Sequence, residues 1–403
     1  MRVHRLPRGV IFALVATFVV AAALWPSRDA IAGSYEQTDL VSDIPGMAAV
    51  TDPNLVNPWG MSFLPPAGPM WVSDNGMGVA TLYNGSGQPF PVGSPLVVTI
   101  ATPSVLPPVP PPPPAAPTGN VFNPTTDFVV TEGGKSGPAV FLCATEDGTI
   151  SGWSPTVNFT QTIRVVDNTD LTNGPVYKGL ALASSGGKNF LYAANFRDAR
   201  IDVFDKNFAN VTASFKFSDP AIPGGFAPFD IRSLNGQLYV TYALQNSSRH
   251  DDVAGAGNGF VDIFNTDGAF VKRLISNDPL NSPWGLAIAP GDFGSLSNDL
   301  LVGDFGDGLI NAFDPNTGTF LGTLDDSLGN PIAIDGLWAL NFGNGGTAGP
   351  TNTLFFTAGI NGEMDGLFGT LTTVPEPPAL ALVGTALLGA ALHRRRDRKG
   401  LRG

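Results

Sequence analysis

Residues 282–286 of the chain read Ser-Pro-Trp-Gly-Leu, and residues 57–61 read Asn-Pro-Trp-Gly-Met. Weaker copies of this pattern are centred near residues 179, 229 and 338. The copies near 179, 229, 284 and 338 lie 50 to 55 residues apart. A period of this length is typical of one four-stranded blade of a β-propeller, in which each blade is a small antiparallel sheet.

Each copy of the pattern is followed by further apolar runs of strand length. The second run reads Met-Trp-Val-Ser-Asp at 70–74, and the third commonly ends on an aromatic residue. The interval from 59 to 179 is about twice the period, and it contains two more such runs, at 140–144 and 148–153. We therefore predict an all-β, six-bladed propeller. Part of segment 35–50 is expected to complete the sixth blade, because ring closure removes exposed sheet edges.

The composition agrees with a large β fold. Of the 403 residues, 43% are hydrophobic and 14% are charged, and 49 Gly with 36 Pro disfavour long helices and coiled coils. The hydrophobic share is sufficient for a core, which excludes wholesale disorder. Cys143 is the only cysteine and lies in an apolar run, so we expect no intramolecular disulfide and a buried thiol.

The first 32 residues have the three parts of a secretory signal peptide. Arg2, Arg5 and Arg8 give a positive start, residues 9–25 are apolar, and Ala-Ile-Ala at 30–32 is a cleavage pattern. We expect a signal helix that is removed, so that the mature chain starts near residue 33. An uncleaved anchor is the alternative, although the apolar run is short for a spanning helix of about 20 residues.

Residues 374–403 form a second targeting segment. An apolar stretch at 378–392 predicts a short transmembrane helix, and its basic tail would remain cytoplasmic and leave the preceding residues outside. The sequence thus predicts a signal peptide at 1–32, a single propeller at 33–373 and a sorting or anchor segment at 374–403. The residues that mark the sorting segment are Pro375, Glu376 and Pro377 before the apolar stretch and Arg394, Arg395 and Arg396 after it.

The Pro-Glu-Pro triplet, the small-residue-rich helix and the arginine cluster resemble a PEP-CTERM sorting signal. That resemblance implies export machinery and an exosortase-like processing enzyme as partners, transient membrane anchoring through the C-terminal segment, and a final place at the cell surface or outside the cell. The Trp-Gly repeats resemble NHL-type six-bladed propellers, and the whole chain resembles a group of PEP-CTERM proteins. This resemblance carries no catalytic residue, and a seven-bladed or irregular propeller remains an alternative.

A proline-rich insertion is predicted at 103–118, in the first connection between blades. Nine of the fifteen residues from 103 to 117 are proline, which predicts an extended polyproline II rod or a stiff loop. The insertion is either a solvated loop without a partner or a docking tract for an aromatic-lined groove.

The charge of the central region excludes one class of partner. Residues 33–374 carry 12 basic and 31 acidic residues, a net charge of −19. Such a surface repels nucleic acid and anionic lipid but attracts cations. His250 is the only histidine between the two targeting segments. A metal site with several histidines is therefore excluded, and so is any serine-hydrolase triad that does not use His250. We interpret His250 as a surface residue.

Oxygen ligands remain as candidate chemistry. Carboxylates and amides suit Ca²⁺, which would be the only cofactor, and a bound cation could polarise an ester. Asp74 and Asp304 are the best candidate ligands, because both end a second strand in the pattern Val-x-Asp, at equivalent positions on neighbouring parts of the ring. The alternative is that the acidic and amide residues only form turns. The full set expected on one rim is Asp74, Asn75, Glu146, Asp147, Asn195, Asp304, Asp307, Glu363 and Asp365.

Two functions remain open. The first is a non-catalytic surface module whose propeller face binds a glycan, a peptide or a matrix component such as extracellular polysaccharide. The alternative is a Ca²⁺-dependent hydrolase of the lactonase or esterase type, acting with acidic residues at the propeller mouth. We favour the first because the sequence assembles no convergent acid, base and nucleophile. Trp59, Trp284 and Trp338 occupy corresponding strand positions and are predicted to be structural core residues.

Overall fold

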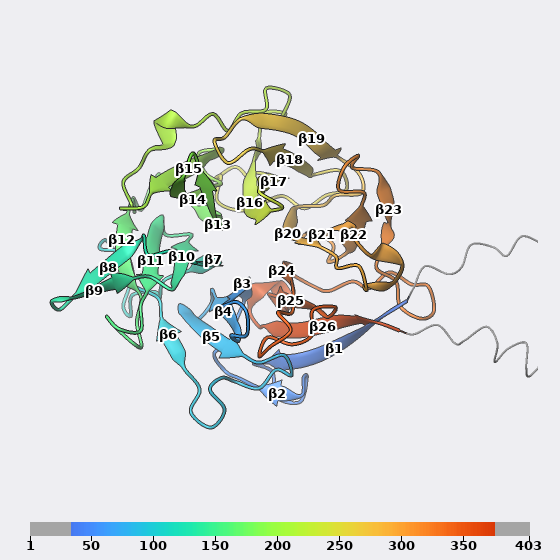
Figure 1. Ribbon diagram of the computed structural model, residues 1–403, viewed down its shortest axis with the longest axis horizontal. Coiled ribbons are helices and arrows are strands. Elements are labelled where there is room, and N and C mark those ends of the chain that lie inside the picture. The colour runs from blue at the N-terminus through green and yellow to red at the C-terminus, as the bar shows by residue number, and fades with distance from the viewer. Residues whose placement is uncertain (1–33, 375–403) are drawn as a thin grey trace, which may run out of the picture.

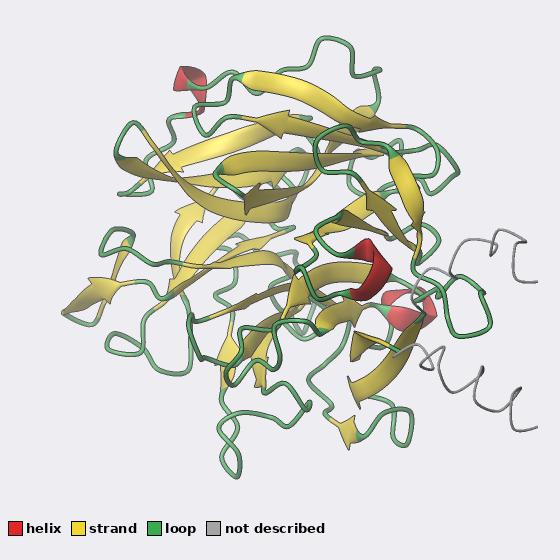
Figure 2. Cartoon of the chain, turned by 45° about the vertical axis from the view of Figure 1, so that its right-hand side comes forward, coloured by secondary structure: helices red, strands yellow, loops and turns green. Residues whose placement is uncertain are grey.

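A ring of six antiparallel sheets surrounds a central channel in the computed structural model, which describes residues 34–374 (Figure 1). Strands account for nearly all regular structure, and the helical elements are single turns (Figure 2). The predicted six-bladed, all-β propeller is therefore confirmed. Both predicted terminal helices and the sorting-signal residues lie outside the described residues. Between residues 34 and 374, no helix is long and apolar enough to cross a membrane.

Four blades contain four strands each, counted outward from the channel. Blade 1 contains β3 (Pro58–Phe63), β4 (Met70–Asp74), β5 (Val79–Tyr83) and β6 (Val97–Thr99). Blade 2 contains β7 (Pro117–Phe122), β10 (Phe141–Thr145), β11 (Thr149–Trp153) and β12 (Ile163–Asp167). Blade 4 contains β16 (Phe226–Leu234), β17 (Gln237–Leu244), β18 (Phe260–Phe264) and β19 (Phe270–Ser276). Blade 5 contains β20 (Pro283–Ile288), β21 (Leu300–Asp304), β22 (Ile310–Phe313) and β23 (Phe320–Thr323).

Blades 3 and 6 depart from this plan. Blade 3 has the strands β13 (Tyr177–Ser185), β14 (Lys188–Asn195) and β15 (Arg200–Asp205), followed by the single turn η1 (Thr212–Ser214). Blade 6 has β24 (Leu337–Phe342), β25 (Leu354–Ala358) and β26 (Leu367–Thr373), with β1 (Tyr35–Ser42) and β2 (Val50–Thr51) outside them. The remaining elements are the hairpin of β8 (Val129–Glu132) and β9 (Lys135–Pro138), η2 (Gly294–Leu296) and α2 (Ile360–Glu363).

The N-terminal strand closes the ring, as the sequence predicted. β1 pairs antiparallel with β26 from Tyr35 opposite Thr373 to Ser42 opposite Leu367. The two ends of the described chain therefore lie side by side, and the amide of Val374 donates a hydrogen bond to Ser34 O at 2.8 Å. Because the first and last strands share one sheet, no blade is left with an unpaired edge at the junction.

Turn residues and close backbone approaches explain the repeated glycines. Asn235 and Gly236 link β16 to β17 with φ of +50° and +78°, which suits a type I′ hairpin. The inner strands of neighbouring blades approach so closely that side chains do not fit between them. A Cβ atom on Gly60 would lie 2.4 Å from Thr118 O, and one on Gly179 would lie 2.2 Å from Asp230 Oδ1. The Gly of the Trp-Gly pattern is thus a requirement of ring packing.

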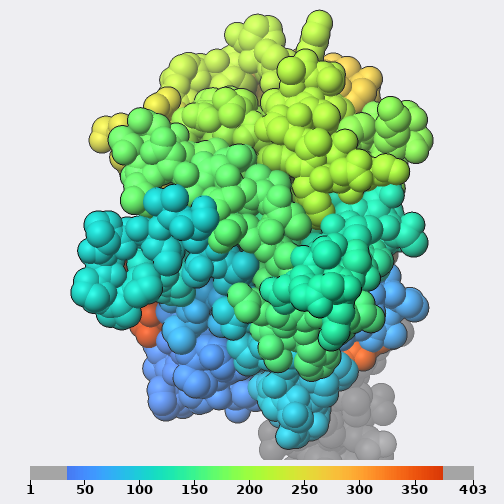
Figure 3. Space-filling model, turned by 90° about the vertical axis from the view of Figure 1, so that its left-hand side faces the viewer, coloured from blue at the N-terminus to red at the C-terminus, as the bar shows by residue number. Residues whose placement is uncertain are grey.

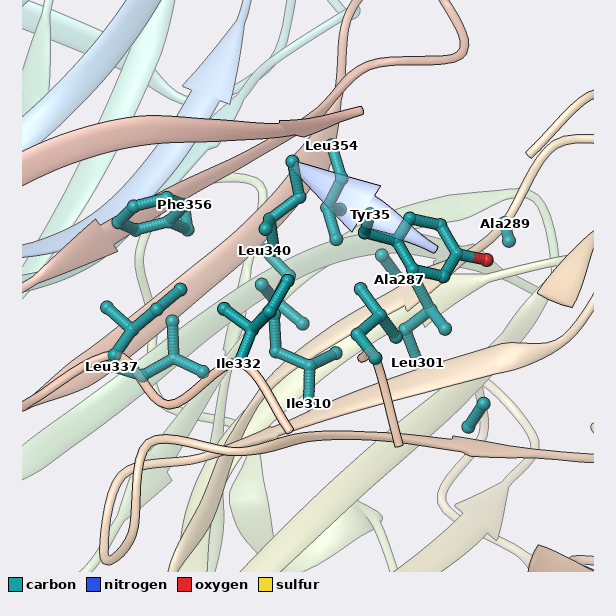
Figure 4. Packing of buried hydrophobic residues seen from close by; sticks show 14 of the residues in the cluster. Tyr35, Ala287, Ala289, Leu301, Ile310, Ile332, Leu337, Leu340, Leu354 and Phe356 are labelled. Carbon is teal, nitrogen blue, oxygen red and sulfur yellow. The ribbon is translucent and has the colours of Figure 1, made fainter. Parts of the chain in front are cut away.

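Hydrophobic clusters hold successive blades together. Tyr35 brings β1 into the cluster between blades 5 and 6, where its ring lies 4.9 Å from that of Phe293 (Figure 4). Cys143 is buried in the cluster between blades 1 and 2, as predicted, and burial raises the pKa of its thiol to about 12. Seen from the side, the surface colours follow chain order from blue to yellow-green, because each blade contacts the next one in sequence (Figure 3).

The proline-rich insertion is fixed at both ends. The amide of Ser104 donates to Asp167 Oδ2, and that of Ala116 donates to Asp147 Oδ2, both at 2.9 Å. Residues 108–114 between these anchors are exposed. Pro117 and Thr118, at the end of the predicted insertion, already belong to inner strand β7.

Candidate ligand site at the channel mouth

Aromatic side chains fill the channel. The rings of Trp59 and Trp338 are stacked with centroids 3.6 Å apart, and Trp284 contacts both edge to face at 6.3 and 5.7 Å. Each of the three residues is at most 2% exposed. The indole N–H groups of Trp59 and Trp338 both donate to Asn57 Oδ1, and that of Trp284 donates to Lys178 O. The three tryptophans are therefore core residues, as predicted, and they meet one another on the ring axis.

A buried lysine lies above this aromatic plug. Lys178 of β13 occupies the strand position that Trp59 has in blade 1, and its Nζ lies 4.8 Å from the centroid of the Trp59 ring. The ammonium contacts Glu146 Oε1 and lies 3.5 Å from Asp251 Oδ1. Burial works against the charge, but the two carboxylates outweigh it and raise the pKa of Lys178. Lys178 thus remains a cation above the aromatic plug.

Loops of three blades supply the groups around the ammonium. Glu146 follows β10 and accepts a hydrogen bond from Asn75 Nδ2 at 3.0 Å, and Asn75 follows β4. Asp251 belongs to the loop after β17, and its Oδ1 lies 2.7 Å from His250 Nδ1. The hydrogen bond with His250 and the charge of Lys178 together lower the pKa of Asp251 to about 2, although burial opposes them. The mouth therefore presents ionised oxygen acceptors beside a fixed cation.

Glu363 brings blade 6 into the site. Its Oε1 accepts a hydrogen bond from Asn57 Nδ2 at 3.3 Å, which links α2 to the segment before β3. Burial raises the pKa of Glu363 to about 7, and the charge of Glu146 contributes. Both Glu363 and Asn57 have positive φ, +66° and +48°, a conformation that costs energy for residues other than glycine. Ser282 has the same position in blade 5 as Asn57 in blade 1 and also has positive φ, +52°, so at Asn57 this conformation belongs to the repeat.

A half-buried aromatic residue forms part of the floor. Phe305 directly follows β21, and its ring is stacked on that of Trp338 with centroids 4.1 Å apart. The mouth thus combines carboxylates, amides and an imidazole with one accessible aromatic ring. This combination can bind a polar ligand that also has a flat apolar face.

The two aspartates predicted as calcium ligands lie elsewhere. Asp74 and Asp304 end β4 and β21, in the equivalent positions that the sequence indicated, but both are 0% exposed instead of lying on an open rim. Each turns toward the third strand of its own blade, where Thr81 Oγ1 and Asn311 Nδ2 donate hydrogen bonds of 2.8 Å. Blades 1 and 5 are separated by blade 6. Whether either aspartate binds Ca²⁺ stays a prediction.

The side chains of these aspartates are fully buried within their own blades. Burial raises the pKa of both carboxyl groups well above the usual range, and one oxygen of each has no hydrogen-bond partner within residues 34–374. Asn195 and Asp202 repeat the same link between second and third strands in blade 3 at 2.9 Å. Asn195 therefore connects strands instead of lining the mouth.

The other predicted rim residues divide into two groups. Asn75, Glu146 and Glu363 meet at the mouth. The remaining three stabilise local structure: Asp147 accepts from Ala116 N at 2.9 Å, Asp307 from Asn281 Nδ2 at 3.1 Å, and Asp365 from Asn361 Nδ2 at 2.9 Å.

One set of groups in the mouth has metal-ligand spacing. Glu146, His250 and Asp251 each offer one ligand atom, and these atoms lie within 4.8 Å of one another. Within the described chain, this is the only such set of three. However, the ammonium of Lys178 contacts two of its three members. A cation bound there would face a fixed positive charge, so the fit to Ca²⁺ is poor.

The two residues at the centre of this site, Lys178 and Asp251, were not predicted from the sequence to be functional. Lys178 was recognised only as part of a weak repeat copy, and Asp251 was not singled out. The signal was present, because a lysine stands where the four other copies have an aromatic residue, Trp59, Phe229, Trp284 and Trp338. Half-exposed His250 was interpreted as a surface residue, and its contact with Asp251 places it on the rim of the mouth.

Comparison with known proteins identifies the C-terminal signal. Residues 373–396 match the PEP-CTERM protein-sorting motif. The chain is 35% identical over 343 residues to uncharacterized protein R648 of Acanthamoeba polyphaga mimivirus, covering 82% of this chain and 78% of that protein. It is 32% identical over 354 residues to uncharacterized protein L690 of the same virus, covering 85% and 87%.

Two solved structures align with this chain at low sequence identity. An α-L-arabinofuranosidase of Fusarium graminearum, solved with arabinobiose, aligns with a TM-score of 0.49 and 13% identity over 85% of this chain and 98% of that chain. A glucose dehydrogenase aligns with a TM-score of 0.46 and 12% identity over 85% and 100%.

Proposed function

We propose that the propeller as a whole, and not the sorting segment, carries the function of this protein. The premise is that this chain belongs to the family of the mimivirus proteins R648 and L690. The alignments with these relatives cover 82% and 85% of this chain, so they include most of the propeller. The proposed function is that of an exported cell-surface module that binds a hydroxyl-rich ligand, such as an extracellular polysaccharide, at the mouth around Lys178. The module binds this ligand without converting it.

The composition of the mouth supports a sugar-like ligand. Each carboxylate oxygen of Glu146, Asp251 and Glu363 has two lone pairs and can accept a further hydrogen bond from a hydroxyl group, and charge-assisted bonds of this kind are the stronger ones. The half-buried ring of Phe305 offers a flat surface to the apolar face of a sugar. Asn57 and Asn75 hold two of these carboxylates in place by 3.3 and 3.0 Å hydrogen bonds, so that little ordering is needed when the ligand binds.

The position of Lys178 is the main observation that argues against metal-assisted catalysis. Its ammonium contacts Glu146 and lies 3.5 Å from Asp251, so it neutralises two of the carboxylates that a divalent cation would need. The same ammonium lies over the Trp59 ring, which fixes it in the channel. The site therefore carries its own permanent cation.

A calcium-assisted hydrolase is the second candidate, and one observation favours it. Glu146, His250 and Asp251 converge within 4.8 Å, and the pKa of about 7 at Glu363 suits a general base near neutral pH. This candidate requires Ca²⁺ to displace the Lys178 ammonium. It predicts turnover of a small ester or lactone that is abolished by chelation.

Export and processing complete the proposal. The sorting motif at 373–396 supports cleavage of the C-terminal segment by an exosortase-type enzyme after the signal peptide is removed. The first and last described residues are neighbours in space, because the amide of Val374 donates a hydrogen bond to Ser34 O. Both targeting segments can therefore be cut without disturbing a blade.

Affinity electrophoresis of the exported protein in gels that contain the surface polysaccharide of its host tests the proposal. We expect retarded migration that persists in EDTA and is lost in Glu363→Gln, because the amide replaces an acceptor oxygen. Glu36→Gln is the matched control, since Glu36 is exposed on β1 in blade 6. Equal retardation of the two variants, or retardation that requires Ca²⁺, would contradict the proposed site.

A further inference from the structure

A small cavity lies at the opposite end of the channel. It is formed toward the ends of the inner strands of blades 1 to 4, whereas Lys178 lies near the start of its strand. Its volume is about 170 Å³. Asn120 and Leu180 are buried at its base, and Ser62, Val121 and Arg232 form part of its partly exposed sides.

Arg232 of β16 is the only charged residue that lines this cavity. Within residues 34–374 its guanidinium donates no hydrogen bond and forms no ion pair, which is unusual for a group with five donors in a partly buried position. Its charged neighbour is Asp230, two residues earlier on the same strand. Burial raises the pKa of Asp230 to about 8 although the charge of Arg232 opposes this shift, so the carboxyl group compensates the guanidinium only in part.

We propose that this cavity binds the carboxylate of a small organic monoanion and that Arg232 recognises its charge. A guanidinium presents two parallel N–H donors that match the two oxygens of a carboxylate. Val121 and Leu180 provide an apolar wall for a short hydrocarbon part. Ser62 donates its own hydroxyl hydrogen to Asn120, so its oxygen can still accept a hydrogen bond from a hydroxyl group on the ligand.

Size and charge restrict the ligand class. The cavity is well below the roughly 300–1,000 Å³ of sites for drug-sized ligands, so it accommodates a small acid or the acidic end of a longer molecule. A single cation that forms no ion pair within the described chain suits one negative charge, whereas a dianion would retain an unpaired buried charge. This inference does not depend on the ligand proposed for the Lys178 mouth, because the aromatic plug lies between the two sites.

Isothermal titration of the purified full chain with sodium propionate at low ionic strength tests the site. We expect saturable binding of one propionate per chain, at least tenfold weaker binding in Arg232→Gln, and no binding of propionamide, which has a similar shape but no charge. Arg249→Gln removes the same charge from an exposed arginine in the loop after β17 and should bind propionate like the parent. Val121→Phe keeps the guanidinium but fills the cavity, and it should also weaken binding at least tenfold.

Three results would overturn the inference. These are the absence of saturable binding, equal affinity in Arg232→Gln and the parent, and binding of sulfate as tight as that of propionate. Cooperative thermal unfolding of each variant shows that it is folded. If Arg232→Gln does not fold, Val121→Phe decides the matter.

Discussion

Replacing Lys178 by methionine tests the physical account of the channel mouth. The substitution keeps an unbranched side chain, shorter by one atom, that can still pack against Trp59, but it removes the cation that Glu146 and Asp251 share. Breaking a buried ion pair by deleting one partner costs about 3–5 kcal/mol, because the remaining charge loses its compensation. The Lys178 side chain is 3% exposed, whereas Glu146 is 14% and Asp251 59% exposed, so water can partly compensate the two carboxylates. We therefore expect Lys178→Met to lower the free energy of unfolding by about 2–3 kcal/mol.

Urea unfolding followed by tryptophan fluorescence measures this change, provided that unfolding and refolding curves coincide. Adding Glu146→Gln to the Lys178→Met protein should recover part of the loss, because it removes the uncompensated charge. Lys188→Met, at an exposed position at the start of β14, is the matched control and should change stability by less than about 0.5 kcal/mol. Lys178→Met should also gain a stabilising response to Ca²⁺, since Glu146, His250 and Asp251 then face no ammonium. Unchanged stability of Lys178→Met, or further loss on adding Glu146→Gln, would refute the reasoning.

Four further predictions follow from the same structure. Folding raises the pKa of Glu363 to about 7 and that of Asp230 to about 8, so the native protein binds more protons than the unfolded chain near neutral pH. The melting temperature should therefore fall as pH rises from 5 to 8. In thermal scans, Glu363→Gln should make this dependence on pH weaker. Gly179→Ala places a Cβ 2.2 Å from Asp230 Oδ1 and should cost about 1–3 kcal/mol in urea unfolding, whereas Gly224→Ala, which meets nothing within 4 Å, should not. Because Asp304 is buried and hydrogen bonded, Asp304→Asn should leave any Ca²⁺-induced shift in melting temperature unaltered; loss of such a shift would instead support the ligand assignment made from the sequence. Intact-mass measurement of protein from its native host should show a chain that lacks both targeting segments, and a full-length cytosolic product would contradict the export proposal.

The repeat copies explain why the blades could be predicted. Wherever Trp-Gly or Lys-Gly starts an inner strand, the close approach of backbones requires the glycine, and the pattern is visible in the sequence. The inner strand β7 lacks this signal, because Thr118 stands where Trp59 stands in blade 1 and the proline-rich insertion runs directly into it. The hairpin of β8 and β9 projects outside the ring and has no repeat equivalent, so periodicity could not indicate it.

The site was less predictable than the fold because its contacts join distant segments. Asn57 and Glu363 are 306 residues apart, and they meet only because β1 closes the ring against β26. Acidic residues at strand ends were expected on an open rim, but a side chain such as that of Asp74 turns into its own sheet when the next strand offers a hydroxyl donor. Which of these two directions a side chain takes depends on packing in three dimensions.

Under the proposed function, the mouth around Lys178 binds a hydroxyl-rich ligand without metal and without turnover. Titration of the exported protein with purified oligosaccharides of its host's surface polysaccharide, in EDTA, with mass spectrometry of the same samples afterwards, tests it most directly. We expect saturable binding that Glu363→Gln weakens, and we expect to recover every oligosaccharide at its original mass. Shortened or de-esterified products, or binding that appears only when Ca²⁺ is restored, would contradict it.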